Sequence, residues 1–254
     1  MIPLCKEKLL MKVGISITVH NGQNNPTGHH DLEECLESLF MVSNFEFEVI
    51  VIDNSSDTKW DHPFLEKDNL EYVYIEDQHL TGGLTGAWNF GIHKLYLKNC
   101  DVILNSGEDI VFNSTINKFV RDIYDAPYKE VGLFGPTANR SGLSTPHQAR
   151  EISSTTGFFE GDKIIETTHS QSTHGGCGYA LAGFFLGFSK EFFEKFNIDN
   201  SIFGSQPECA WGGQEVELFE KNTPKGMRSF ILESGYITHK KHRSWMKGPT
   251  WKKS

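Results

Sequence analysis

The sequence predicts an α/β fold whose mainly parallel sheet is flanked by helices. In the first 110 residues, short apolar runs alternate with amphipathic stretches, which is the order of strands and helices in such a sheet. Several apolar runs are followed closely by Asn or Asp, as at Asn21, Asp53 and Asp109. Because open α/β sheets bind ligands at the carboxyl ends of their strands, this pattern predicts a shared site there.

Hydrophobic periodicity and the polar residues between apolar runs predict the first three elements. Residues 13–19 (VGISITV) are apolar enough to predict a buried strand, and the polar loop 23–30 follows them. Apolar residues at helical spacing predict a helix over 31–40, with Asp31 as its cap. A second apolar run predicts a strand over 47–52.

The next elements continue the alternation. Residues 70–75 predict a third strand, and a Gly-rich turn over 81–86 precedes a helix expected over 87–97. A fourth strand is expected over 101–104. Periodicity then fades between residues 140 and 177, where a long loop and a small extra β element both fit.

The last part of the chain predicts a smaller set of elements. An apolar, Gly-punctuated stretch over 179–188 leads to a helix over 190–196, and residues 236–239 predict a final strand. An amphipathic and helical segment is expected to follow the glycine pair at 212–213. No internal repeat and no linker divides the sequence, so we expect one domain.

Composition places the chain among globular proteins. Of its 254 residues, 38% are hydrophobic and 12% aromatic, which suffices for a substantial core. No run reaches the ~18–20 apolar residues of a membrane span, and the N-terminus lacks a signal-peptide profile. Five scattered cysteines without a C-x-x-C pair argue against a zinc knuckle and a disulfide scaffold. We therefore expect a soluble, cytoplasmic protein.

The net charge of −9 is unevenly distributed. Residues 240–254 carry six Lys or Arg and no carboxylate, and they end in a basic tail over 246–254. Such a segment fits a polyanion, an acidic membrane or a diphosphate, and equally a solvated terminus. The acidic remainder of the chain argues against broad, non-specific DNA binding.

Acidic residues and late histidines supply the candidate chemistry. Glu108 and Asp109 follow an expected strand end, where carboxylates can hold a divalent cation. His239 lies at the end of the last expected strand and could complete the metal shell, with His242 as the alternative. A further acidic group follows the glycine pair, whose turn allows close approach of the backbone to a ligand. These features predict a metal-assisted site for a phosphorylated substrate.

Five short blocks, in order, resemble glycosyltransferases of the GT-A fold, particularly the family 2 type. Each block is short, but together they extend over about residues 13–245, nearly the whole chain. The resemblance implies a Rossmann-like GT-A sheet with a C-terminal acceptor-side region. The blocks are ITVHN (17–21), VIDNSSD (51–57), GLTGAWNFG (83–91), AGFFLGF (182–188) and WGGQEVEL (211–218).

The resemblance also implies roles for individual residues. A nucleotide-binding half would cover about 11–110 and an acceptor and catalytic half about 111–245. Mn²⁺ or Mg²⁺ would be held by Asp109 and His239, and the donor, with a UDP-sugar favoured, would contact His20, Asn21, Asp53, Gly83, Asn89 and Glu108.

The block near the C-terminus would carry the catalytic base. Glu215 would accept the proton of the acceptor hydroxyl in an inverting transfer, and Glu217 would support it. Trp211, Gly212 and Gly213 would contact the acceptor, which could be a glycan, another hydroxyl compound or modified DNA.

Departures from the family pattern keep an alternative open. Gly107 occupies the first position of the usual D-x-D metal motif, and Gln214 with Glu215 replaces the usual Glu-Asp pair. A GT-A domain that binds a nucleotide or glycan without turnover is therefore the alternative. A nucleotidyltransferase is disfavoured because residues 20–23 (HNGQ) do not form a Gly-rich, basic phosphate loop.

Overall fold

A computed structural model provides the structure of the chain. The helices are α1 (Gly28–Val42), α3 (Gly83–Leu97), α4 (Ile116–Asp125) and α5 (Lys190–Phe196), with short 3₁₀ turns η1 (Pro63–Glu66) and η3 (Thr223–Lys225). The residues that the structure describes are 11–23, 25–77, 83–139, 163–167, 170–171, 177–178, 181, 183–196, 218–219 and 221–240.

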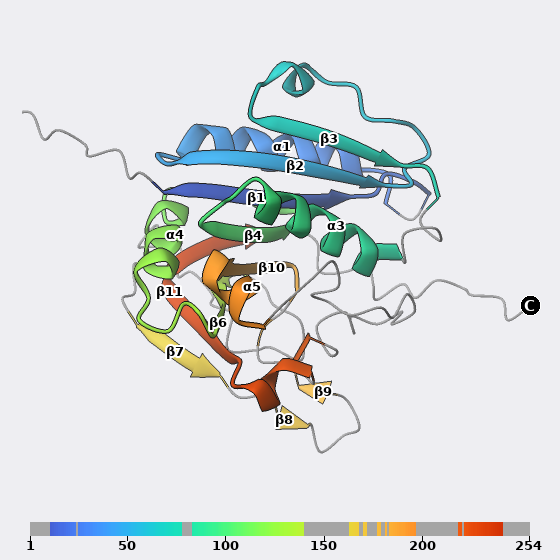
Figure 1. The fold of residues 1–254 in the computed structure, drawn as a ribbon. Helices are drawn as coiled ribbons and strands as arrows, with labels where there is room; N and C mark the ends of the chain where they lie inside the picture. The colour runs from blue at the N-terminus through green and yellow to red at the C-terminus, as the bar shows by residue number, and fades with distance from the viewer. Residues whose placement is uncertain are drawn as a thin grey trace, which may run out of the picture.

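The strands form one large sheet and one small hairpin. Their bounds are β1 (Lys12–Val19), β2 (Glu46–Asn54), β3 (Leu70–Ile75), β4 (Val102–Gly107), β5 (Ile110–Val111), β6 (Gly132–Ala138), β7 (Ile164–Thr167), β8 (Ser170–Gln171), β9 (Cys177–Gly178), β10 (Phe185–Ser189) and β11 (Arg228–His239). Within the described ranges the large sheet has the order β3-β2-β1-β4-β10-β6-β11-β5, with β7 beside β11. Figure 1 shows β3, β2, β1 and β4 side by side.

The first four strands of this order are all parallel. β1 pairs with β2 on one side and β4 on the other, and β2 pairs with β3. α1 packs on one face of these strands and α3 on the opposite face, so each face buries its own apolar cluster (Figure 1). Because the connections through α1 and α3 use opposite faces, the crevice between the carboxyl ends of β1 and β4 is a switch point.

The second half of the sheet mixes strand directions. β10 runs antiparallel to both β4 and β6, and β6 runs parallel to β11. β5 and β7 pair antiparallel with β11. α4 packs against β11 and β10, and the phenylalanines of α5 join the same cluster as α3. The α/β fold class that the sequence predicts is confirmed.

Two helices begin earlier than their sequence predicts. Strand 70–75 and helix 190–196 match the prediction, but α1 begins at Gly28, so Asp31 lies in its first turn and does not cap it. Gly28 packs so tightly that an added Cβ would lie 2.3 Å from the His20 carbonyl oxygen. α3 begins at Gly83, so residues 83–86, which were predicted as part of a turn, are helical.

β4 and β11 extend well beyond their predicted bounds. β4 continues to Gly107, so Asn105 and Ser106 are strand residues and are fully buried. β11 begins at Arg228, eight residues before the expected start at Tyr236. Both extensions include polar residues, which local hydropathy does not predict as strand. Their backbone is extended because it hydrogen-bonds to the neighbouring strands. Of the helices in the described part of the chain, none is long and apolar enough to cross a bilayer.

Candidate functional site

The candidate site lies where β4 turns into β5, beside the end of β11. Asp109 Oδ2 and His239 Nε2 are 3.2 Å apart, and each side chain is only 13% exposed. His239 is paired with Ile110 across the β5–β11 ladder, and the Lys240 amide donates to the Asp109 carbonyl at 2.9 Å. The fold thus brings together the two predicted metal ligands, which stand 130 positions apart in the sequence.

A bulge in β11 decides which way His239 faces. Between Leu232 and Tyr236, four steps along β11 correspond to a single step along β6. The three extra residues are an odd number, so the alternation of side chains between the two faces is reversed beyond the bulge. Ile237 therefore packs in the same core cluster as Leu232, and His239, two residues further, shares that face.

The His239 ring is held on several sides. It stacks on Phe184 with a centroid distance of 4.5 Å and an interplanar angle of 17°. The His239 amide donates to Asn139 Oδ1 at 2.7 Å. The His239 Nδ1 is buried and has no hydrogen-bond partner among the described residues. The stacking on Phe184 and the bond to Asn139 hold the ring in one orientation beside Asp109.

Glu108 ties the turn after β4 to the loop after β1. Asn25 Nδ2 lies 2.7 Å from Glu108 Oε1 and 2.6 Å from the His20 carbonyl oxygen, so one amide joins both segments. The Cys35 thiol of α1 lies close by: burial raises its pKa well above the ordinary value, and the charges of Asp109 and Glu108 raise it further. The two predicted acidic residues therefore belong to one rigid corner of the fold.

Asp53 is engaged within the protein. Its side chain is fully buried, and Oδ1 accepts a hydrogen bond from the Ser56 amide at 3.1 Å. Oδ2 accepts from the Tyr72 hydroxyl at 2.7 Å and lies 3.2 Å from His29 Nε2. Burial and this hydrogen bond raise the pKa of Tyr72. Asp53 is the second-last residue of β2, and its bond to the Ser56 amide closes the turn after the strand, a structural role open to an Asp at this position.

His20 and Asn21 join the ends of β1 and β2. His20 Nδ1 is 3.0 Å from the Asn54 carbonyl oxygen, and the Asn21 amide donates to Ser56 Oγ at 2.8 Å. Asn21 Oδ1 accepts from the His29 amide at 3.3 Å, at the start of α1. These contacts hold the loop after β1 against the end of β2, on the same edge of the sheet as Asp109.

The remaining predicted residues either lie on α3, apart from Asp109 and His239, or lie outside the described residues. Gly83 starts α3 with a left-handed φ of 67°, and Asn89 is buried in the same helix, across the sheet from α1. The predicted catalytic and acceptor residues lie outside the described residues, as does the alternative histidine: Trp211, Gly212, Gly213, Glu215, Glu217 and His242.

Sequence reasoning missed a group of buried polar atoms on the α3 face. Five atoms are buried and have no hydrogen-bond partner in the part of the chain that the structure describes: Ser16 Oγ, Thr18 Oγ1, Asn54 Oδ1 and both amide atoms of Asn105. They lie on β1, β2 and β4, and Ser16 is paired with Asn105 in the ladder. The sequence does contain a sign of this group, because each of these polar residues lies within or just after an apolar run. Such atoms need water or a ligand as a partner.

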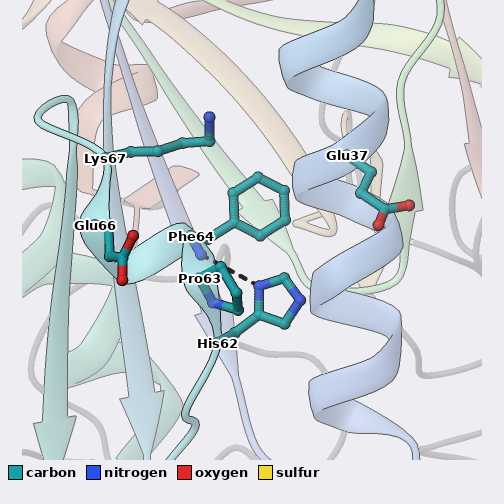
Figure 2. Close-up of a pocket in the computed structure, with 6 residues that line it drawn as sticks. All are labelled: Glu37, His62, Pro63, Phe64, Glu66 and Lys67. Atoms are coloured by element: carbon teal, nitrogen blue, oxygen red, sulfur yellow. Dashed lines mark hydrogen bonds between the residues drawn. The ribbon is translucent and has the colours of Figure 1, made fainter.

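An open groove lies away from this edge. It has a volume of about 410 Å³, and Figure 2 shows Glu37 of α1 facing Phe64 across it. η1, which forms one wall, leads into the amino end of β3, whereas the predicted residues gather at carboxyl ends of strands. The groove contains none of the predicted site residues; its lining consists of Glu37, His62, Pro63, Phe64, Glu66 and Lys67.

Asp109 and His239 form a donor set that fits a divalent cation. One carboxylate oxygen and one imidazole nitrogen suit Mn²⁺ better than Mg²⁺, which prefers oxygen ligands. In the described part of the chain, no three His, Cys, Asp or Glu side chains gather into a metal site. A cation here would therefore need phosphate oxygens and water as its other ligands, as is usual for cations that bind nucleotides.

The fold is similar to solved structures of a glycosyltransferase. S. aureus TarS, residues 1–349 in complex with UDP, matches with a TM-score of 0.53 and 15% identity, over 90% of this chain and 60% of that one. A second crystal structure of S. aureus TarS, residues 1–349, matches with a TM-score of 0.52 and 16% identity, over 93% of this chain and 63% of that one. The sequence matches no protein-family model and no curated protein. Because its structure is similar to those of TarS, the chain has the GT-A fold.

Proposed function

We propose, from the GT-A fold and the site at its sheet edge, that the chain is a metal-dependent glycosyltransferase. It would move a sugar from a nucleoside diphosphate donor to an acceptor hydroxyl. The observation that carries the proposal is the pairing of Asp109 with His239 at 3.2 Å, at the carboxyl edge of the sheet. The fold of TarS, whose structure contains UDP, supports a UDP-sugar as the donor.

Asp109 and His239 would hold the divalent cation, with Mn²⁺ favoured by the imidazole nitrogen. When bound, the cation would supply Lewis-acid stabilisation of the negative charge on the departing diphosphate. The Asp109–His239 contact keeps both side chains pointing at one position, and Phe184 fixes the plane of the imidazole. A preoriented pair loses less conformational entropy when it binds than two mobile side chains would.

The predicted donor-binding residues would act together with this pair. Glu108 is held by Asn25 and would accept hydrogen bonds from the donor. Asn21 and His20 position the loop after β1, and Asp53 supports that loop through His29. Gly83 and Asn89 would contribute from α3, on the face of the sheet opposite α1.

Glu215 would act as the general base in an inverting transfer. It would take the proton from the acceptor hydroxyl as that oxygen attacks the sugar from the face opposite the diphosphate. Glu217 would support Glu215, and Trp211 would stack on a sugar ring of the acceptor beside Gly212 and Gly213. These roles rest on the resemblance of the WGGQEVEL block.

The acceptor, the division of the chain into two halves and the cellular location are also proposals that rest on the sequence. A glycan or another hydroxyl compound is favoured, and DNA with hydroxylated bases is a further possibility because of the basic segment 240–254. The nucleotide-binding half over 11–110 and the acceptor half over 111–245 would act as one domain, in the cytoplasm.

Titration calorimetry with nucleotides tests the proposal. UDP, GDP, dTDP and CDP are each titrated with Mn²⁺ and with EDTA, against the wild type and Asp109→Ala, His239→Ala and His62→Ala. We expect one nucleotide to bind in a Mn²⁺-dependent manner, and each change at the pair to weaken that binding at least about tenfold. His62→Ala alters only the remote groove and should bind as the wild type does.

Two outcomes would change the conclusion. If no nucleotide binds in any condition, the donor site is refuted. If a nucleotide binds but the matching nucleotide sugar is neither hydrolysed nor transferred with Mn²⁺, the chain is a GT-A domain that binds without turnover.

A further inference from the structure

Asn25, in the loop after β1, joins two segments through one side-chain amide. Its Nδ2 lies 2.6 Å from the His20 carbonyl oxygen and 2.7 Å from Glu108 Oε1. Both partners are oxygens that accept hydrogen bonds, so the amide nitrogen, which has two N–H groups, must face them. The Asn25 backbone is fixed as well: it pairs with Gly22 in a β-bridge, and its carbonyl accepts from the Gly28 amide at 3.2 Å. Glu108 is thus bonded to a well-anchored side chain.

The next carboxylate in the chain, Asp109, is bonded to a different segment. Its Oδ2 is 3.2 Å from His239 Nε2 at the end of β11, and its carbonyl accepts from the Lys240 amide at 2.9 Å. Glu108 is bonded instead to the loop after β1. The two consecutive carboxylates of the β4–β5 turn are therefore held by two separate parts of the fold.

Gly107, which precedes them, adds no carboxylate and leaves room for Asp109. A Cβ added to Gly107 would lie 3.1 Å from Asp109 Oδ1, which is closer than most such contacts. The Asp109–His239 pair therefore offers a cation one carboxylate and one imidazole, a set with a single negative charge. Such a set leaves a divalent cation with excess positive charge, which the phosphates of a nucleotide can neutralise.

We propose that Asn25 is a positioning residue that holds Glu108 out of the ligand shell of the cation. As a result, the free protein binds the cation weakly, and the cation and the nucleotide bind together. The inference rests on the proposed function and deepens it, since it concerns the cation of the same donor site.

Loss of the Asn25 amide tests this inference. Asn25→Ala removes both side-chain hydrogen bonds, including the one that holds Glu108. The matched control is Asn69→Ala: Asn69 Nδ2 also donates to a backbone carbonyl, that of Phe47 at 3.1 Å, but it lies at the amino ends of β2 and β3. Electron paramagnetic resonance of free Mn²⁺ measures the affinity for the cation alone. Calorimetry measures UDP binding with Mn²⁺, and thermal unfolding checks that each variant is folded.

We expect the wild type and Asn69→Ala to bind Mn²⁺ alone weakly. Asn25→Ala should bind it at least about tenfold more tightly, because a second carboxylate adds its charge to that of Asp109. Adding Glu108→Gln to Asn25→Ala should remove this gain, because a neutral amide attracts a divalent cation less strongly. A gain in cation affinity on loss of a hydrogen bond, and its reversal by a second substitution, would not follow from a purely structural role.

Glu108→Gln alone provides a test that leaves Asn25 intact. The Gln side-chain oxygen can still accept from the Asn25 amide, so this variant should fold as the wild type does. Its affinity for Mn²⁺ alone should equal that of the wild type, because Glu108 is not a ligand while Asn25 holds it.

The failures of the two proposals are distinguishable. The role of Asn25 is refuted if Asn25→Ala binds Mn²⁺ no more tightly than the wild type, or if Glu108→Gln alone weakens Mn²⁺ binding. In either case, Mn²⁺-dependent UDP binding by the wild type would still support the donor site. If the wild type does not bind UDP with Mn²⁺, the UDP-sugar donor of the proposed function fails, and the role of Asn25 at that site fails with it.

Discussion

Gly91 allows α3 to lie directly on β1. An added Cβ at this position would be 2.1 Å from Ser16 Oγ and 3.3 Å from Ile52 Cγ1. Glycine inside a helix is otherwise unfavourable by about 1 kcal/mol relative to alanine, so close packing accounts for its presence. The Ser16 hydroxyl that it faces has no hydrogen-bond partner within the described ranges.

Substitution at this contact should show a suppressor effect. We expect Gly91→Ala to lower the free energy of unfolding by about 1–2 kcal/mol, because the steric cost exceeds the gain in helix propensity. Ser16→Ala removes the clashing oxygen, so the double variant should be about as stable as the wild type. Urea unfolding of the three variants measures this. Equal stability of Gly91→Ala and the wild type would contradict the packing argument.

At the scale of elements, Thr115 anchors the end of β11 beyond its bulge. Thr115 Oγ1 lies 2.8 Å from the Tyr236 amide nitrogen and 2.9 Å from the Tyr236 carbonyl oxygen, so it can bond both sides of the bulged strand. Thr137 Oγ1 donates to the Gly235 carbonyl at 2.8 Å. These buried bonds hold the segment that delivers His239 to Asp109.

Removal of the Thr115 hydroxyl should therefore affect both stability and the site. Thr115→Val keeps the shape but leaves the Tyr236 amide unsatisfied, which costs about 1–3 kcal/mol in unfolding free energy. We also expect weaker Mn²⁺-dependent UDP binding, measured by calorimetry, because the end of β11 loosens. Thr115→Ser retains the hydroxyl and should keep both properties. A Val variant as stable as the Ser variant would argue against this anchor.

At the scale of the whole molecule, Lys240 joins distant parts of the chain. Lys240 Nζ lies 2.6 Å from Asp31 Oδ1 and also pairs with Glu34, both on α1. Its amide bonds the Asp109 carbonyl, so one residue links α1, the β4–β5 turn and the end of β11. The first residue of the basic segment 240–254 is therefore a structural contact.

Loss of this cation should destabilise the whole fold. Asp31 is only 5% exposed, so Lys240→Met leaves a nearly buried carboxylate without its positive partner. We expect the free energy of unfolding to fall by about 1–3 kcal/mol in urea titrations. Lys225→Met, at an exposed lysine of η3, is the control and should change little. Equal effects of the two substitutions would show that Lys240 adds no more than a surface charge.

Local pattern alone determined the α/β class and several elements. Strand 70–75 and helix 190–196 follow directly from short-range periodicity, because burial of a face imposes its period on the sequence. The same reasoning selected Asp109 and His239 separately, as polar residues at expected strand ends. It also selected Asp53, but it could not tell a ligand-binding carboxylate from one that ends a strand.

Contacts between distant residues decided the rest. The bulge in β11 turns His239 towards Asp109, and it depends on the pairing with β6, about a hundred residues earlier in the chain. The burial of Asp53 under Tyr72 and His29 joins three separate segments. Hydrophobic periodicity and composition do not predict such pairings, because strand register and side-chain packing are set only when the sheet assembles. The sequence by itself thus determined the class of fold and the candidates for the site, and tertiary structure decided which of them meet.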